Sequence, residues 1–145
     1  MQLISWLIRY GHVLAATAWV GGYVLLAFFI IPCIQKGEKN EALVNLTVVI
    51  VRILTYTGTL TMGFGLVLIT RTRGFANLFT GAWGAFIITG FVIALVLLGI
   101  GDGMLRPALL KIEQVGNGPA RRWATIGAAL TVLAVGIMTG ATYVM

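Results

Sequence analysis

Residues 82–101, AWGAFIITGFVIALVLLGIG, form an apolar run without a single charged side chain. A helix of about 20 apolar residues is long enough to cross the hydrocarbon core of a bilayer. The apolar residues are continuous rather than alternating, which is not the pattern of a transmembrane β-strand. The run therefore predicts one membrane-spanning helix.

Three further runs are also mainly apolar, each with a single arginine, and they cover about residues 3–31, 46–70 and 122–144. Each is predicted to be a helix, because a span in lipid must satisfy its backbone polar groups internally. Only 10% of the 145 residues are charged, whereas soluble domains usually carry about 25%. We therefore expect one all-α domain over residues 1–145, built as an integral membrane four-helix transmembrane bundle.

The net charge of +6 at pH 7 does not indicate a nucleic-acid partner, because the basic residues lie at the ends of the apolar runs. One side of the membrane is predicted to carry only Arg9, Arg71 and Arg73. The first and third loops carry the larger group, which is Lys36, Lys39, Arg52, Arg106, Lys111, Arg121 and Arg122. An excess of Lys and Arg marks the cytoplasmic side. We expect a multi-pass protein of the plasma (inner) membrane with both termini outside.

His12 is the only histidine of the chain, and it lies inside the first apolar run. An ionisable side chain in a membrane span is a functional candidate by default. Neutral imidazole is also a common ligand of metals and of haem iron. The alternative is a histidine that only donates a hydrogen bond to a carbonyl oxygen.

Two methionines are expected near the depth of His12, at 1.5 Å per residue along each helix. They are Met62 in the second run and Met138 in the fourth. Methionine in an apolar span is often packing material. As ligands, the two thioethers fit two kinds of centre: haem iron accepts histidine with methionine opposite, and copper(I) favours thioethers beside imidazole. Both centres remain open at this point.

A haem also needs a flat slot and cations for its propionates. Arg9, Arg71 and Arg73 are expected at the outer rim, where the alternative role is contact with lipid phosphate. Tyr10 is a further candidate beside His12. Small residues are expected to provide the slot, and they are Gly11, Ala15, Ala16, Gly58, Gly63, Gly65 and Gly90.

Two other features point to helix packing. Arg52 is flanked by apolar residues on both sides. Its side chain either extends to the inner interface or pairs with Asp102, and we favour the pair because each charge needs a partner in a span. The pairs Gly99–Gly103 and Gly136–Gly140 fit the spacing of close helix approach. They indicate either packing within one bundle or the seam of a homodimer. The chain has no CxxC, HExxH or P-loop motif, so any chemistry is expected to belong to a bound cofactor.

The segment Tyr10-Gly-His12-Val-Leu-Ala-Ala-Thr-Ala-Trp19-Val-Gly21-Gly22 resembles the first-span signature of small four-helix membrane proteins. These include the copper-resistance D-like proteins and the HemJ-type protoporphyrinogen oxidases. The resemblance implies a haem or copper site at His12.

We expect a b-type haem protein that carries out redox or electron-transfer chemistry, or that binds oxygen or nitric oxide. A haem-dependent oxidoreductase is one form of this expectation, and its partner would be a membrane electron donor or acceptor. The alternatives are a copper-binding or copper-transport protein using His12, Met62 and Met138, and a structural subunit of a larger complex.

Overall fold

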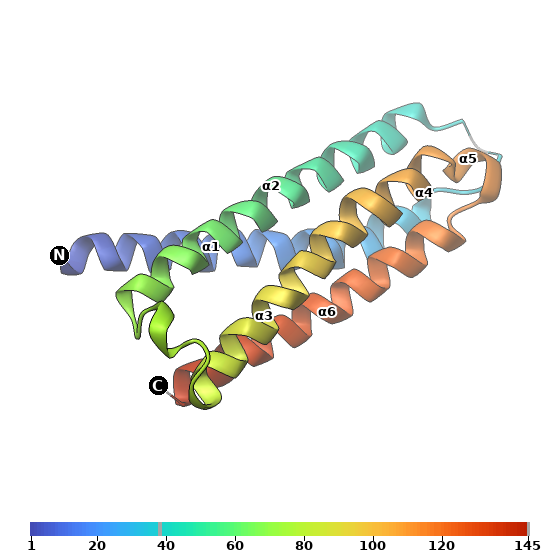
Figure 1. The fold of residues 1–145 in the computed structure, drawn as a ribbon. Helices are drawn as coiled ribbons and strands as arrows, with labels where there is room; N and C mark the ends of the chain where they lie inside the picture. The colour runs from blue at the N-terminus through green and yellow to red at the C-terminus, as the bar shows by residue number, and fades with distance from the viewer. Residues whose placement is uncertain (38, 145) are drawn as a thin grey trace.

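The computed structural model describes residues 1–37 and 39–144, which form an all-α bundle of four long helical segments (Figure 1). The four segments are Gln2–Cys33, Glu41–Arg71, Gly81–Leu110 and Gly118–Tyr143, and each is long and apolar enough to cross a membrane. The expected fold class is therefore confirmed. The chain has the architecture of a multi-pass membrane protein.

Helix α1 (Gln2–Leu25) lies against α2 (Glu41–Arg71), and α3 (Gly81–Gly99) runs beside α6 (Gly118–Tyr143). Both chain termini lie at one end of the bundle (Figure 1). We call this the termini end, and it includes the 72–80 connection with its short 3-10 helix η3 (Phe75–Asn77).

We call the opposite end the basic end. It holds the 34–40 connection and the short helices α4 (Arg106–Leu110) and α5 (Ile112–Val115). Residue 38 of this connection falls outside the described residues. Helix α2 begins there with Asn40, whose Oδ1 accepts a hydrogen bond of 3.2 Å from the Leu43 amide, as expected of an N-cap.

Two helical segments contain a wider π-helical stretch. In the first, η1 (Leu26–Ile30) is followed by the 3-10 turn η2 (Ile31–Cys33), which contains Pro32 and closes the segment near the predicted end. In the third, η4 (Ile100–Leu105) carries the helix past the predicted end at Gly101 as far as Leu110. Pro107 does not stop this helix, and it lies directly after the π-helical stretch, within the continuous segment.

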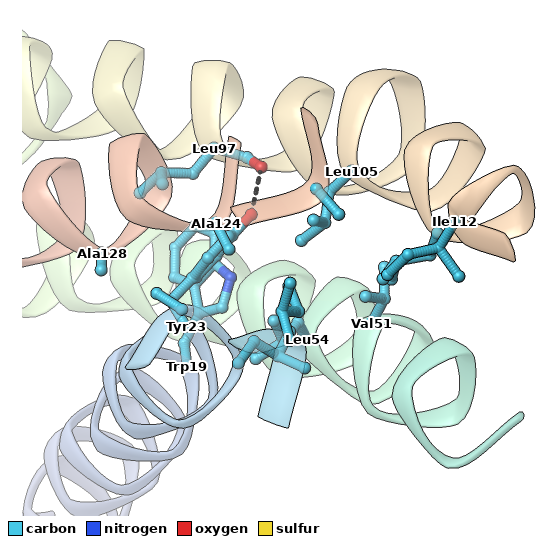
Figure 2. Packing of buried hydrophobic residues seen from close by; sticks show 14 of the residues in the cluster. Trp19, Tyr23, Val51, Leu54, Leu97, Leu105, Ile112, Ala124 and Ala128 are labelled. Atoms are coloured by element: carbon cyan, nitrogen blue, oxygen red, sulfur yellow. Dashed lines mark hydrogen bonds between the residues drawn. The ribbon is translucent and has the colours of Figure 1, made fainter. Parts of the chain in front are cut away.

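The main buried cluster lies toward the basic end and joins all four segments. Its centre is Tyr23, which is 1% exposed and donates a hydrogen bond of 2.8 Å to the carbonyl of Leu97 (Figure 2). The ring of Tyr23 packs against Gly127, and Trp19 packs against Gly58. Trp19 thus packs between α1 and α2.

The termini half of α1 contrasts with this core, because α1 has no buried residue before Ala15. Leu3, Trp6, Tyr10 and Leu14 are all at least half exposed. At this end the other helices form only a small cluster, made of Ile69, Trp83 and Ala141. The first half of α1 is thus peripheral, and His12 lies on it.

Candidate functional site

The imidazole of His12 is fixed to the neighbouring helix by its Nδ1 atom. Nδ1 lies 2.8 Å from the backbone carbonyl oxygen of Thr61 on α2. A carbonyl oxygen can only accept, so Nδ1 carries the hydrogen and donates it. The neutral ring then keeps its lone pair on Nε2, which is the atom left to bind an electron-pair acceptor.

Gly65 explains how the ring reaches this carbonyl. On a helix, the residue four positions later lies over the same face, so a side chain at position 65 would stand beside the carbonyl of Thr61. A Cβ built on Gly65 would lie 3.3 Å from Cε1 and 3.6 Å from Nδ1 of His12. The missing side chain therefore provides part of the space that the imidazole occupies.

The site lies within the spans rather than at their ends. Gly11 faces Phe64, and Gly22 faces Leu54, so α1 and α2 stay in antiparallel contact on both sides of His12. At 1.5 Å per residue, Thr61 lies roughly 15 Å along α2 from Arg71. His12 is thus a half-buried imidazole at an intramembrane depth.

The two predicted thioether ligands have other packing partners. The side chain of Met138 covers Gly90 on α3, where its methyl group takes the space that a Cβ would need. Met62 packs against the main buried cluster. Their roles as iron or copper ligands stay predictions, and the described contacts of both are those of ordinary packing.

The small residues predicted to provide a haem slot differ in what lies over them. The phenyl ring of Phe64 lies over Gly11, the side chains of Trp19 and Leu98 lie over Gly58, and Met138 lies over Gly90. Three of the small residues therefore serve close packing within the bundle. Gly63 differs, since a Cβ there would meet nothing within 4 Å.

The predicted cationic rim is at the termini end and is exposed. Arg9 and Arg71 are both exposed, and Arg71 stands in the last turn of α2. The guanidinium carbon of Arg73 lies 5.9 Å from the centroid of the Trp83 ring, a cation–π contact that the sequence did not indicate. Tyr10 is 54% exposed and stacks on Trp6 with ring centroids 5.5 Å apart.

The arrangement around His12 can be compared with what an axial haem ligand requires. An axial haem ligand needs one imidazole nitrogen, with the other ring nitrogen held by a carbonyl or carboxylate. His12 meets both conditions. Within the described part of the chain, no group of three or more His, Cys, Asp and Glu side chains is placed to hold a metal ion, so a closed site of such ligands does not fit.

A second polar contact lies near the basic end. Oδ1 of Asp102, in η4, accepts a hydrogen bond of 3.2 Å from Thr55 Oγ1 on α2. The sequence had predicted Arg52 as the partner of Asp102. In the structure Asp102 is instead paired with Thr55, which lies about one turn after Arg52 on α2. The hydroxyl of Thr55 is neutral, so this pairing places no second charge within the span.

No family model, curated protein or solved structure matches this chain. The resemblance of residues 10–22 to the first span of copper-resistance D-like and HemJ-type proteins therefore stays a prediction.

Proposed function

We propose that this chain is an integral membrane protein of the plasma (inner) membrane that binds a b-type haem through Nε2 of His12. The observation that carries the proposal is the hydrogen bond from Nδ1 to the carbonyl of Thr61. It selects the tautomer with a free Nε2 and holds the ring in one orientation, as is usual for ligating histidines. His12 is the only imidazole that the sequence contains.

Such a haem would supply reversible one-electron chemistry, or binding of oxygen or nitric oxide. The chain's part is to present one nitrogen donor at fixed geometry within an apolar setting. Its exposed outer arginines, Arg9 and Arg71, are suited to propionate carboxylates. Because side chains fill the space at Gly11 and Gly58, we place the macrocycle against the exposed surface beside α1 rather than inside the bundle.

The visible spectrum of the purified protein, with iron and copper measured on the same sample, tests this proposal. We expect a Soret band, a change in the visible bands on reduction, and iron in proportion to protein. A protein that copurifies with copper and shows no Soret band would favour a copper site. A protein that gains no Soret band when haem is added would contradict the proposal outright.

A further inference from the structure

Two neighbouring arginines stand near the start of α6, at the basic end of the bundle (Figure 1). Arg121 and Arg122 are both exposed. They line a hollow in the outer surface of the molecule together with Gly118, Thr125 and Ile126. These positions follow one another at spacings of three and four residues, so they share one side of the helix. We call this surface the arginine hollow.

The opposite side of the same turns is packed into the bundle. Ala120 and Ala124 are buried in the main cluster, and Trp123 packs against that cluster. These inward contacts fix the rotation of α6 about its own axis. The arginine hollow is therefore directed toward whatever surrounds the bundle at this level.

The acidic residues of the described chain lie elsewhere. The first turn of α6 contains no acidic residue. Glu41 and Glu113 line a different groove, between the start of α2 and helix α5, and Asp102 accepts its hydrogen bond from Thr55. The fourth acid, Glu38, lies outside the described residues. Among the described residues, no ion pair joins either arginine of the hollow to a carboxylate.

The arginine hollow lies at the level of a lipid headgroup. From Arg121 to Tyr143, at the other end of α6, the helix rises about 33 Å at 1.5 Å per residue. This length is close to the hydrocarbon thickness of a bilayer, which is about 30 Å. On the membrane side of the arginines, the same face of α6 continues as an exposed row of apolar residues, which are Ile126, Ala129 and Leu133.

We propose that the arginine hollow binds an anionic phospholipid of the surrounding leaflet. The lipid phosphate lies between the two guanidinium groups, whose planar fork suits phosphate oxygens. One acyl chain follows the apolar row from Ile126 to Leu133. Basic residues at the end of a span attract anionic lipids in this way.

The combination of charge and apolar surface selects this occupant. A free anion would use the guanidinium groups but would have no use for the apolar row. A zwitterionic lipid would bring its own positive group next to two arginines. The inference goes beyond haem binding and does not depend on it, because the arginine hollow lies toward the basic end whereas His12 lies on the termini half of α1.

Native mass spectrometry of the full chain tests the lipid and its place. The protein is released from mixed micelles that contain equal amounts of phosphatidylglycerol and phosphatidylcholine with the same acyl chains. The unchanged protein should retain phosphatidylglycerol in preference. Arg121→Gln combined with Arg122→Gln should lower the ratio of the two retained lipids about fivefold or more. Because a micelle has no sides, the result does not depend on how the variant was inserted in the cell.

Lys36→Gln combined with Lys39→Gln is the matched control. It removes the same charge from the same end of the bundle, at two exposed positions, and should leave the lipid ratio unchanged. An equal loss in both double variants would mean that net charge alone attracts the lipid, and it would overturn the proposal. An undiminished preference in the arginine variant, or dimers of the chain without retained lipid, would overturn it as well.

Competition in the unchanged protein separates a lipid from a free anion. Glycerol phosphate presents a phosphate group without acyl chains. Added at the same concentration as phosphatidylglycerol, it should not displace the retained lipid, because it cannot use the apolar row. Displacement would identify a site for a bare anion and would contradict the proposal.

Discussion

The carbonyl of Thr61 holds Nδ1 of His12 at a distance of 2.8 Å. The ring reaches it through a gap in the side-chain surface of α2 where Gly65 has no Cβ. This contact fixes which ring nitrogen is free, and it joins the peripheral half of α1 to the rest of the bundle. The proposed chemistry depends on it, and the first prediction concerns the glycine.

Gly65→Ala should disturb the His12 site without weakening the helix. The new Cβ would lie 3.3 Å from Cε1 of His12, so the ring must move by a few tenths of an ångström, which would disturb its hydrogen bond to Thr61. Alanine itself favours the helix by about 1 kcal/mol over glycine. We expect weaker haem binding and a shifted Soret band, measured by haem titration.

Gly63→Ala is the control for this experiment. Position 63 is on the same helix, but a Cβ there meets nothing within 4 Å. Its haem affinity and spectrum should match those of the unchanged protein. If Gly65→Ala and Gly63→Ala behave alike, the close approach of Gly65 has no role in the site.

Met62→Leu and Met138→Leu test whether either thioether completes an iron site. Their packing on the core cluster and on Gly90 leads us to expect that neither exchange changes the spin state of the haem. Each should cost less than about 1.5 kcal/mol of stability, as volume-conserving exchanges do. Magnetic or resonance Raman measurements report the spin state. A conversion from low spin to high spin in one variant would identify its sulfur as the sixth ligand.

The four helices were predictable from the sequence because continuous apolar runs have no other stable form in lipid. The π-helical stretches were not predictable, because one extra residue in a helical turn leaves no recognisable pattern in the amino-acid composition. Gly101, Asp102 and Gly103 suggested an end to the third span. The structure keeps them helical, with the helix continuing to Leu110.

Tyr23→Phe should destabilise the bundle without affecting haem. The exchange removes the hydroxyl that donates to the buried carbonyl of Leu97, and a hydrogen bond of this kind contributes about 1 kcal/mol. The free energy of unfolding in mixed micelles measures the loss. Tyr56→Phe is the control, because Tyr56 is 64% exposed, and it should have little effect. Equal stability of the two variants would show that the Tyr23 bond contributes nothing measurable.

The orientation of the bundle is predicted from its Lys and Arg residues. Both termini should lie outside and the 34–40 connection in the cytoplasm. A reporter enzyme that is active only outside the membrane should work when it is fused to the C-terminal end of the chain. The same reporter inserted in the 34–40 connection should be inactive. The reverse pattern would move His12 into the cytoplasmic half of the membrane.

The candidate site was only partly visible in the sequence. His12 stood out because it is a single imidazole in an apolar run, but its partner is a backbone carbonyl, which every residue has. The only signal for that partner was Gly65, and it was one of many glycines. Arg52 was predicted as the partner of Asp102 because it carries the opposite charge. The observed partner is Thr55, whose hydroxyl lies within hydrogen-bond distance of the carboxylate.

Removal of the His12 imidazole tests the central claim most directly. His12→Ala, purified beside the unchanged protein, should keep its four spans and helical content but lose the Soret band, because the sequence holds no other imidazole. Free imidazole added to this variant should restore part of the spectrum by filling the vacated space. Full haem occupancy in His12→Ala, with an unchanged spectrum, would contradict the account.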